Sequence, residues 1–195
     1  GEVFQYQLEN PVTIERQKSA MLPILSAPVQ SRRVSIYNRA DAAKNPMRGV
    51  ELINSTGLQF IPGPISVYDG AAYAGDAQIG HVGAGDKRLL AYAVDLESEV
   101  TTEQNDVAEI RKIRIVDGVF EQTILRQAKV QYSIANKDKK RPRTLIVEHP
   151  RLANWDLTEP KEPTEKTEAL YRFEVPVPPA KQGTLQVVQQ HTDYQ

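Results

Sequence analysis

Hydrophobic and polar residues alternate along most of this chain in short segments. Between Phe4 and Leu8 every second residue is apolar, the spacing that turns one face of a β-strand toward a core and the other toward water. The same pattern predicts strands over residues 33–37, 49–53, 65–68, 89–94, 143–148, 171–177 and 184–188. No segment between them has helical spacing, so we expect an all-β protein with antiparallel sheets, because parallel neighbours need long crossovers.

A β-hairpin is predicted between Ile115 and Phe120. Its centre, Asp117-Gly118, is a pair that supports the positive φ angles of a type I′ turn between two β-prone strands. The second strand keeps its apolar spacing as far as Asn136, and we expect one break in it near Arg126-Gln127.

Two polar segments resemble connectors. Residues 97–106 (ESEVTTEQND) have no apolar face, and residues 159–168 (EPKEPTEKTE) are more polar still. We therefore predict two β-sandwich units in tandem, with an N-terminal unit over residues 1–98 and an immunoglobulin-like unit over residues 99–195. Segment 159–168 would be a long exposed loop of the second unit.

Composition restricts the chemistry more than the fold. The chain has 195 residues, no cysteine and a formal net charge of -1, so disulfides, thiolate catalysis and cysteine-ligated zinc are excluded, and no overall charge favours nucleic acid. No run of apolar residues is long enough for a transmembrane helix. The chain starts at Gly1 rather than Met, and we expect that an N-terminal region of a longer parent protein is missing.

Several segments resemble one bacterial family. They are FQYQLENPVTI (4–14), AMLPIL (20–25), GPISVYDGAAYAGDAQIGHVGAGDKRLLAYAVDL (63–96), YSIANKDKKRPRTLIVEHP (132–150) and YRFEVPVPPAKQGTLQVV (171–188). In type and order they resemble the C-terminal domain of unknown function of mucoidy-inhibitor A-like bacterial proteins. The resemblance implies an all-β fold, a bacterial origin and an association with the cell envelope, in the periplasm if the parent carries a signal peptide. It provides no catalytic residues to transfer.

Candidate motifs for catalysis or metal binding are weak. The three histidines, His81, His149 and His191, lack the i+2 or i+4 spacing that places two imidazoles on one metal. The glycine-rich segment 80–85 is followed by a strand pattern rather than by the helix that a phosphate loop requires, and so it predicts a tight turn. Asp69-Gly70 and Gly75-Asp76 are likewise interpreted as turns. We therefore expect no catalytic residue, cofactor or metal.

Two charged segments have binding alternatives. Residues 137–143 (KDKKRPR) are basic and could contact nucleic acid or anionic lipid, but no aromatic residue interrupts them, so a solvated turn is favoured. The acidic side chains between Glu97 and Glu109 could bind calcium at a domain junction, although they lack the spacing of a dedicated loop.

Tyrosines give the remaining candidate surface. Tyr68, Tyr73 and Tyr92 lie near predicted turns and could form a ligand or partner platform, although such rings are more often buried. From these patterns we expect a non-catalytic structural or protein-interaction module of a larger bacterial protein, with protein as its partner. The alternative is a carbohydrate-binding or carbohydrate-active β-sandwich that uses the tyrosines.

Overall fold

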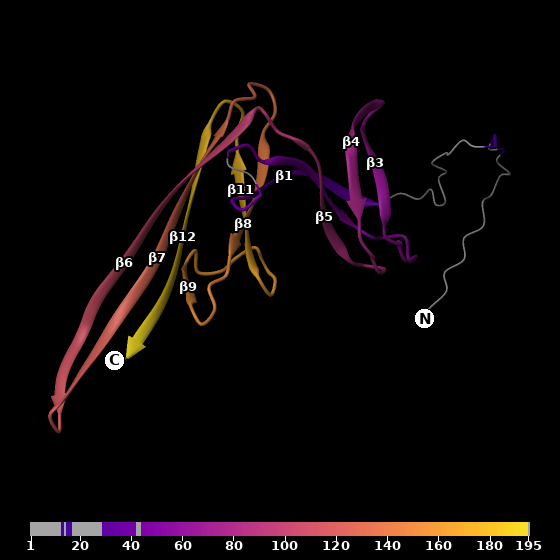
Figure 1. The fold of residues 1–195 in the computed structure, drawn as a ribbon. Coiled ribbons are helices and arrows are strands. Elements are labelled where there is room, and N and C mark those ends of the chain that lie inside the picture. The colour runs from indigo at the N-terminus through magenta and orange to yellow at the C-terminus, as the bar shows by residue number, and fades with distance from the viewer. Residues whose placement is uncertain (1–12, 14, 17–28, 42–43, 195) are drawn as a thin grey trace.

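The computed structural model describes residue 13, residues 15 and 16, residues 29–41 and residues 44–194 (Figure 1). All regular secondary structure within these residues is β-strand, which confirms the predicted all-β class. This described part of the chain contains no helix that could cross a membrane. The strand expected at residues 4–8 lies outside the described residues.

The described residues form twelve strands. In chain order they are β1 (Gln30–Asn38), β2 (Met47–Ile53), β3 (Gly63–Asp69), β4 (Ala72–Ile79), β5 (Lys87–Val94), β6 (Ser98–Val116), β7 (Val119–Asn136), β8 (Arg143–Pro150), β9 (Asp156–Glu159), β10 (Glu165–Lys166), β11 (Leu170–Val177) and β12 (Gln182–Tyr194). Each strand predicted within the described residues is found. Strand β4, most of β6 and the short strands β9 and β10 were not predicted.

Six strands form the largest sheet, in the order β10-β11-β8-β1-β2-β5. Its neighbouring strands are antiparallel with one exception, since β1 runs parallel to β8 and places Tyr37 beside Val147. The predicted antiparallel pairing is therefore wrong for this pair and confirmed for the others. A parallel pair needs a long crossover, and here the connection contains β2 to β7 instead of a helix.

Two smaller antiparallel sheets complete the fold. One has the order β6-β7-β12-β9, and the other is the β3–β4 hairpin. Within the coloured ribbon of Figure 1, the β3–β4 hairpin lies at one end, β1, β8 and β11 lie in the middle, and the β6–β7 hairpin extends away at the other end.

Two separate hydrophobic clusters hold these sheets together. The main cluster joins the six-stranded sheet to the four-stranded sheet, and its buried members are Tyr37, Val100, Val130, Tyr132, Ile134, Leu145, Val147, Tyr171, Phe173, Val175, Val177 and Val187. The second cluster packs the β3–β4 hairpin on β2 and β5 through Leu52, Ala77 and Leu90, with Val50, Ile65, Ile79 and Tyr92 around them. Period-two alternation supplies these side chains from one face of each strand.

The glycine turns agree with the predictions in part. Gly70 has a φ of 63° and lies between β3 and β4, as expected of a turn residue. The turn predicted at Gly75-Asp76 is wrong, because both residues lie inside β4. A Cβ on Gly75 would lie 2.3 Å from the carbonyl oxygen of Tyr92, so glycine allows β4 to approach β5 closely.

Two further predictions about the central segment are wrong. Residues 98–106, expected to be part of a connector, form the first half of β6. The segment lacks an apolar face because most of this edge strand is exposed on both sides. The break expected near Arg126-Gln127 is absent, since these residues pair with Ala108 and Val107; the irregularity lies on the partner strand, between Ile110 and Lys112.

The second polar segment, residues 159–168, runs from the end of β9 past the short strand β10. The backbone N–H of Thr164 donates to the carbonyl oxygen of Arg172, and Glu165 pairs with Arg172. Within this segment only β10 adds to the edge of the six-stranded sheet, and the residues between β9 and β10 form a loop, as predicted for most of the segment.

Candidate interaction surface

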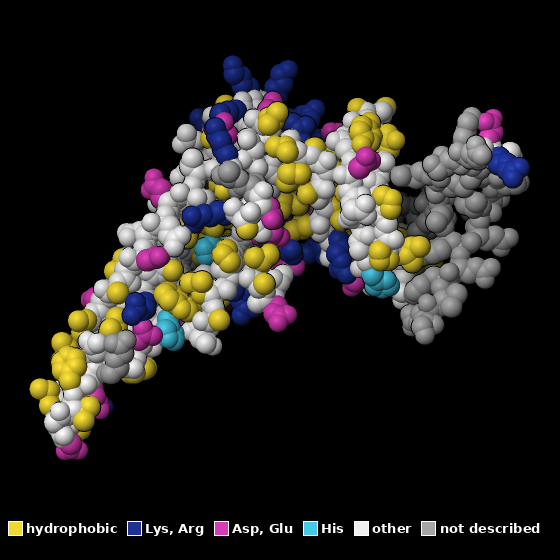
Figure 2. All heavy atoms as spheres, in the orientation of Figure 1, with side chains coloured by type: hydrophobic (Ala, Val, Ile, Leu, Met, Phe, Trp, Pro, Cys, Tyr) yellow, Lys and Arg dark blue, Asp and Glu magenta, His cyan; other side chains and the backbone are white. Residues whose placement is uncertain are grey.

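The outer part of the β6–β7 hairpin, residues 107–127, projects from the rest of the described chain, and we call it the arm (Figures 1 and 2). Asp117 and Gly118 turn the chain at its tip with φ angles of 51° and 80°. Both angles are positive, as a type I′ turn requires, so the predicted hairpin is confirmed. Among the described residues, β12 pairs with β7 as far as Tyr194 and Thr123, and residues 113–122 beyond that point pair only with each other, as a two-stranded ribbon.

Apolar side chains are concentrated along this arm. Ile115 is 73% exposed and Phe120 is 56% exposed, and further large apolar residues around them are also exposed, namely Val107, Ile110, Ile113, Val116 and Val119. Figure 2 shows hydrophobic side chains gathered at the arm's outer end. Isolated exposed apolar residues are ordinary, but a contiguous group of this kind is typical of an interaction site.

The strand register shows which side chains share a face. Ile115 lies opposite Phe120 and Ile110 lies opposite Ile124, and residues paired in this way point to the same side of a ribbon. Alternate residues of a strand point to the same face, so Phe120 and Ile124 lie on the face of β7 that carries the core residue Val130. The apolar face of the arm therefore continues the face that the six-stranded sheet covers closer to the core.

The opposite face of the tip is also apolar. Val116 lies opposite Val119 at the turn, and behind them Arg114 lies opposite Glu121 and forms an ion pair with it. A second ion pair joins Arg126 to Asp193. Such surface ion pairs contribute little to stability. They orient side chains on the arm but add little to the free energy that keeps the arm folded.

The tyrosines predicted as a platform are separated by the fold. Tyr68 and Tyr73 form an edge-to-face pair at the outer end of the β3–β4 hairpin, with ring centroids 5.9 Å apart and exposures of 62% and 59%. Tyr92 instead packs against the second hydrophobic cluster. Two of the three residues thus form an exposed aromatic pair, and the third contributes to packing.

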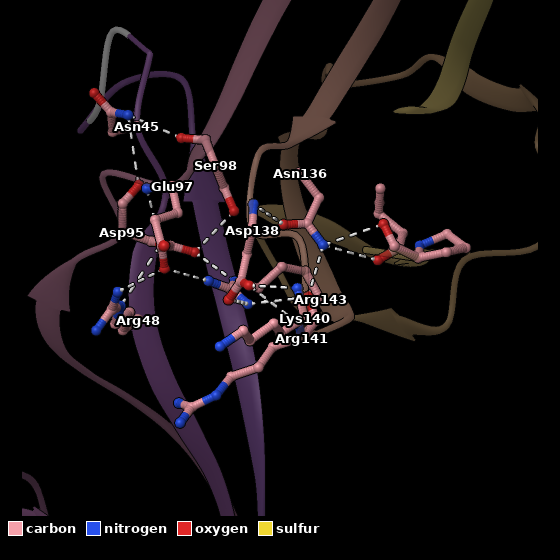
Figure 3. A network of polar contacts seen from close by, with 12 residues as sticks. Asn45, Arg48, Asp95, Glu97, Ser98, Asn136, Asp138, Lys140, Arg141 and Arg143 are labelled. Carbon is pink, nitrogen blue, oxygen red and sulfur yellow. Dashed lines mark hydrogen bonds and ion pairs between the residues drawn. The ribbon is translucent and has the colours of Figure 1, made fainter. Parts of the chain in front are cut away.

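A polar network connects the two halves of the chain (Figure 3). Arg143 donates through Nε to Asp95 at 2.8 Å, through Nη1 to Asp138 at 3.1 Å and through Nη2 to Glu97 at 3.2 Å. The Ser98 hydroxyl also donates to Asp95, which is fully buried. Burial raises the pKa of Asp95, but the hydrogen bonds from Arg143 and Ser98 outweigh it, so the pKa lies below its ordinary value.

The predicted basic turn, residues 137–143, is partly neutralised within this network. Lys137 pairs with Glu99, and Arg143 pairs with three acids. The backbone N–H groups of Lys140 and Arg141, together with Arg143, hold the pKa of Asp138 at about 2. In the described part of the chain no ion pair involves Lys139, Lys140 or Arg141.

Three carboxylates of the predicted acidic segment also form ion pairs. Glu97 pairs with Arg48 and Arg143, Glu99 pairs with Lys44 and Lys137, and Glu109 pairs with Arg111. No group of three or more histidine or acidic side chains is arranged to hold a metal ion among the residues that the structure describes. These carboxylates thus balance neighbouring cations.

His149 has the most perturbed environment of the histidines. It is buried, with Nδ1 2.6 Å from the Tyr132 hydroxyl and Nε2 3.0 Å from Nε2 of Gln189. Burial, with a smaller effect of Arg39, lowers the pKa of His149 to about 4, and burial raises the pKa of Tyr132 to about 12. Because both side chains are buried, a substrate could reach them only if the core opened.

Sequence reasoning identified the hairpin but not the exposed apolar face of its arm. The alternation Ile113-Arg114-Ile115 was the available signal, and it shows only that one face is apolar. Whether that face is covered depends on where the six-stranded sheet ends, which the pattern does not contain.

No family model, no curated protein and no solved structure matches this chain.

Proposed function

We propose that this chain is a non-catalytic interaction module whose arm contacts another protein. The observation that carries the proposal is the exposed apolar tip of the arm, with Ile115 and Phe120 on one face and Val116 and Val119 on the other. Contiguous exposed apolar surface marks contact sites, and a two-stranded ribbon bathed in water on both faces is only marginally stable. A partner that encloses the tip would remove this surface from water and stabilise the ribbon.

The resemblance to the C-terminal domain of mucoidy-inhibitor A-like bacterial proteins is consistent with this role, because that domain is one part of a larger protein. We therefore propose that the partner is a protein of the same bacterial cell envelope, or another part of the parent chain. The all-β class supports the resemblance at the level of fold class only.

We also propose the two-unit organisation predicted from sequence. Within 99–195 lie all buried members of the main cluster except Tyr37, which supports an immunoglobulin-like sandwich there. The second cluster takes every member from residues 50–92, which supports a separate N-terminal unit. Strand β1 would join the two by pairing with β8.

The test is site-specific photo-crosslinking in the intact parent protein. A photoreactive phenylalanine analogue replaces Ile115, and in a control protein it replaces Leu96, which is 74% exposed but lies outside the arm. We expect a defined protein adduct from position 115 and none from position 96. The triple variant Ile110→Thr/Ile113→Thr/Phe120→Thr should weaken the adduct at least tenfold, because central apolar anchors provide most of the binding free energy.

Two outcomes would contradict the proposal. One is an adduct whose yield is unchanged in the triple variant, and the other is equal labelling from positions 115 and 96. Folding is checked by urea denaturation, where we expect a small change because the three replaced side chains are exposed.

A carbohydrate-binding β-sandwich is the second candidate, and the exposed Tyr68–Tyr73 pair is the observation that favours it. Exposed aromatic rings can stack on sugar faces. The same proteins on a glycan array would support this candidate if binding disappeared in Tyr73→Ala and persisted in the arm variant. An array without signal would remove it. Tyr92→Ala would not be informative here, because Tyr92 packs in the second cluster.

A further inference from the structure

A groove of about 460 Å³ lies on the face of the six-stranded sheet between its two covering layers. On one side is the end of the β3–β4 hairpin, which contributes Asp69, and on the other is the loop that leads into β8, with Arg141 and Pro142. Both layers cover the same face, because the register places Leu145 of the main cluster beside Ser35 and Val50 of the second cluster beside Arg33. The groove is the part of this face that neither layer covers.

Four arginines line this groove: Arg33 of β1, Arg48 of β2, Arg143 of β8, and Arg141 of the preceding loop. Arg48 is the direct cross-strand partner of Ser35, which also lines the groove and lies on the same face as Arg33. Guanidinium groups gathered in this way repel one another, and the repulsion is offset only where acidic groups or a bound anion lie among them.

The acids of the chain neutralise these arginines unequally. Arg143, whose side chain is only 12% exposed, takes up the two least exposed acids, Asp95 and Asp138. Arg33 pairs with Asp69 at the groove's edge. The contacts of Arg48 are longer, at 3.6 Å to Asp95 and 3.4 Å to Glu97.

Arg141 has no acidic partner among the described residues. Its side chain is exposed, and in Figure 3 it extends beyond the carboxylates of the network. The groove therefore retains guanidinium donors that the chain itself does not neutralise.

The Ser35 hydroxyl is a second and independent observation. Ser35 is 3% exposed and lines the groove, and no hydrogen bond to its hydroxyl is formed within the described part of the chain. Among the described residues, the buried side-chain polar atoms without a hydrogen-bond partner are the Tyr37 hydroxyl and Arg151 Nε, and the Ser35 hydroxyl is not one of them. This hydroxyl is therefore open to the groove and can donate to a group bound there.

We propose that this groove binds an oxyanion group, a phosphate or a carboxylate, of a small ligand. Guanidinium groups pair with either oxyanion through two parallel N–H···O bonds, and these charge-assisted bonds are about twice as strong as neutral ones. Arg141 and Arg48 would hold the oxyanion from two sides, and the Ser35 hydroxyl would donate to it from the floor. A volume of about 460 Å³ is within the usual range of small-molecule sites. This site is separate from the arm and does not depend on its function.

Thermal unfolding of the full chain in added salts tests the proposal. Sodium phosphate and sodium acetate are titrated at constant ionic strength, with sodium chloride as the exchanged salt. A ligand that binds only the folded state raises Tm in a saturable way, so we expect saturation with phosphate or with acetate. The salt that saturates the rise in Tm at the lower concentration carries the oxyanion that the site prefers.

Two variants locate the effect. Arg141→Gln should weaken the apparent affinity at least tenfold, because one charge-assisted contact is lost, and Ser35→Ala should weaken it to a smaller degree. Lys139→Gln removes an exposed charge from the same loop but not from the groove lining. The apparent anion affinity of this variant should therefore match that of the parent chain. Because the Arg141 side chain is exposed and unpaired, Arg141→Gln should retain the Tm of the parent chain without added anion.

Three results would overturn the proposal. The first is a Tm that responds to chloride as it does to phosphate and acetate. The second is an apparent anion affinity that is unchanged in Arg141→Gln. The third is an apparent anion affinity that is weakened in Lys139→Gln as much as in Arg141→Gln. Nuclear magnetic resonance provides a second readout on the unmodified protein. The arginine Nε–Hε signals of Arg141 and Arg48 should shift with the same midpoint as the Tm, and an absence of shift in both would also refute the site.

Discussion

At the scale of single residues, hydrogen-bond geometry determines which ring nitrogen of His149 carries its proton. The side chain of Gln189 accepts from the backbone N–H of Leu152 and donates to the carbonyl oxygen of Pro150, so its amide orientation is determined. The Gln189 amide nitrogen must then donate to Nε2 of His149, and the ring proton lies on Nδ1, facing the Tyr132 hydroxyl. The folded state therefore needs neutral His149.

This requirement predicts how stability depends on pH. The pKa of His149 is about 4 in the folded state and about 6.5 in an unfolded chain. The free energy of unfolding should be constant above pH 6.5 and should fall as the pH drops toward 4, because only the unfolded state then binds the proton. The full loss is about 3 kcal/mol.

Urea denaturation between pH 7.5 and 4.5 measures this loss, and His149→Leu is the control. The variant should be less stable at pH 7.5, because the Tyr132 hydroxyl loses its partner, but its stability should vary far less across this window. Carboxylates with lowered pKa values, such as Asp95, lose their contribution only at lower pH. A slope that persists unchanged in His149→Leu would show that another group is responsible.

At the scale of elements, the arm and the strands behind it differ in what holds them. Strand β7 contributes Val130, Tyr132 and Ile134 to the main cluster, whereas no residue of the arm belongs to either cluster. Backbone pairing continues without interruption along β7 into the arm, so the rigid part of the sheet supports the exposed part. Such an arrangement presents an apolar contact surface on a fixed scaffold.

We predict that the two-stranded tip can be removed with little effect on folding. Residues 113–122 are deleted and Lys112 is joined to Thr123, its partner across the ribbon, through Asn-Gly. The free energy of unfolding should change by less than about 1 kcal/mol, since no core residue is lost. Chemical denaturation tests this, and a loss above about 2 kcal/mol would show that the tip belongs to the folding unit.

At the scale of the whole molecule, the six-stranded sheet crosses the predicted boundary at residue 98. Strands β1, β2 and β5 come from the N-terminal side, and β8, β10 and β11 come from the C-terminal side. The Asp95–Arg143 ion pair lies close to this boundary and joins the two sides. The proposed units would thus share a sheet while keeping separate hydrophobic clusters.

The two-unit hypothesis predicts that residues 95–195 fold alone. This fragment keeps Asp95 and every buried member of the main cluster except Tyr37. We expect a cooperative thermal transition by circular dichroism, at a lower Tm than in the full chain, because losing a large buried aromatic side chain costs about 3–5 kcal/mol. A fragment without cooperative unfolding would show that the chain forms a single unit.

The amino-acid sequence by itself determined the local features of this protein. Alternation between Arg143 and Glu148, or between Tyr171 and Val177, predicted strands because period two follows from backbone geometry alone. Asp117-Gly118 predicted its turn because that turn needs positive φ angles, which few residue pairs adopt readily. The sequence failed at residues 98–106, where only Ser98 and Val100 are buried and residues 103–106 are exposed, so the segment has too few inward-facing apolar residues to reveal a strand.

Only the tertiary structure decided which segments meet. Strand β1 lies beside β8, more than a hundred residues further along the chain, and this contact brings Arg33, Arg48 and Arg143 to one groove. It also decided that Ile115 and Phe120 remain exposed while Tyr132 on the same strand pair is buried. The physical reason is that burial depends on where a covering layer ends, and the packing of distant strands sets that position.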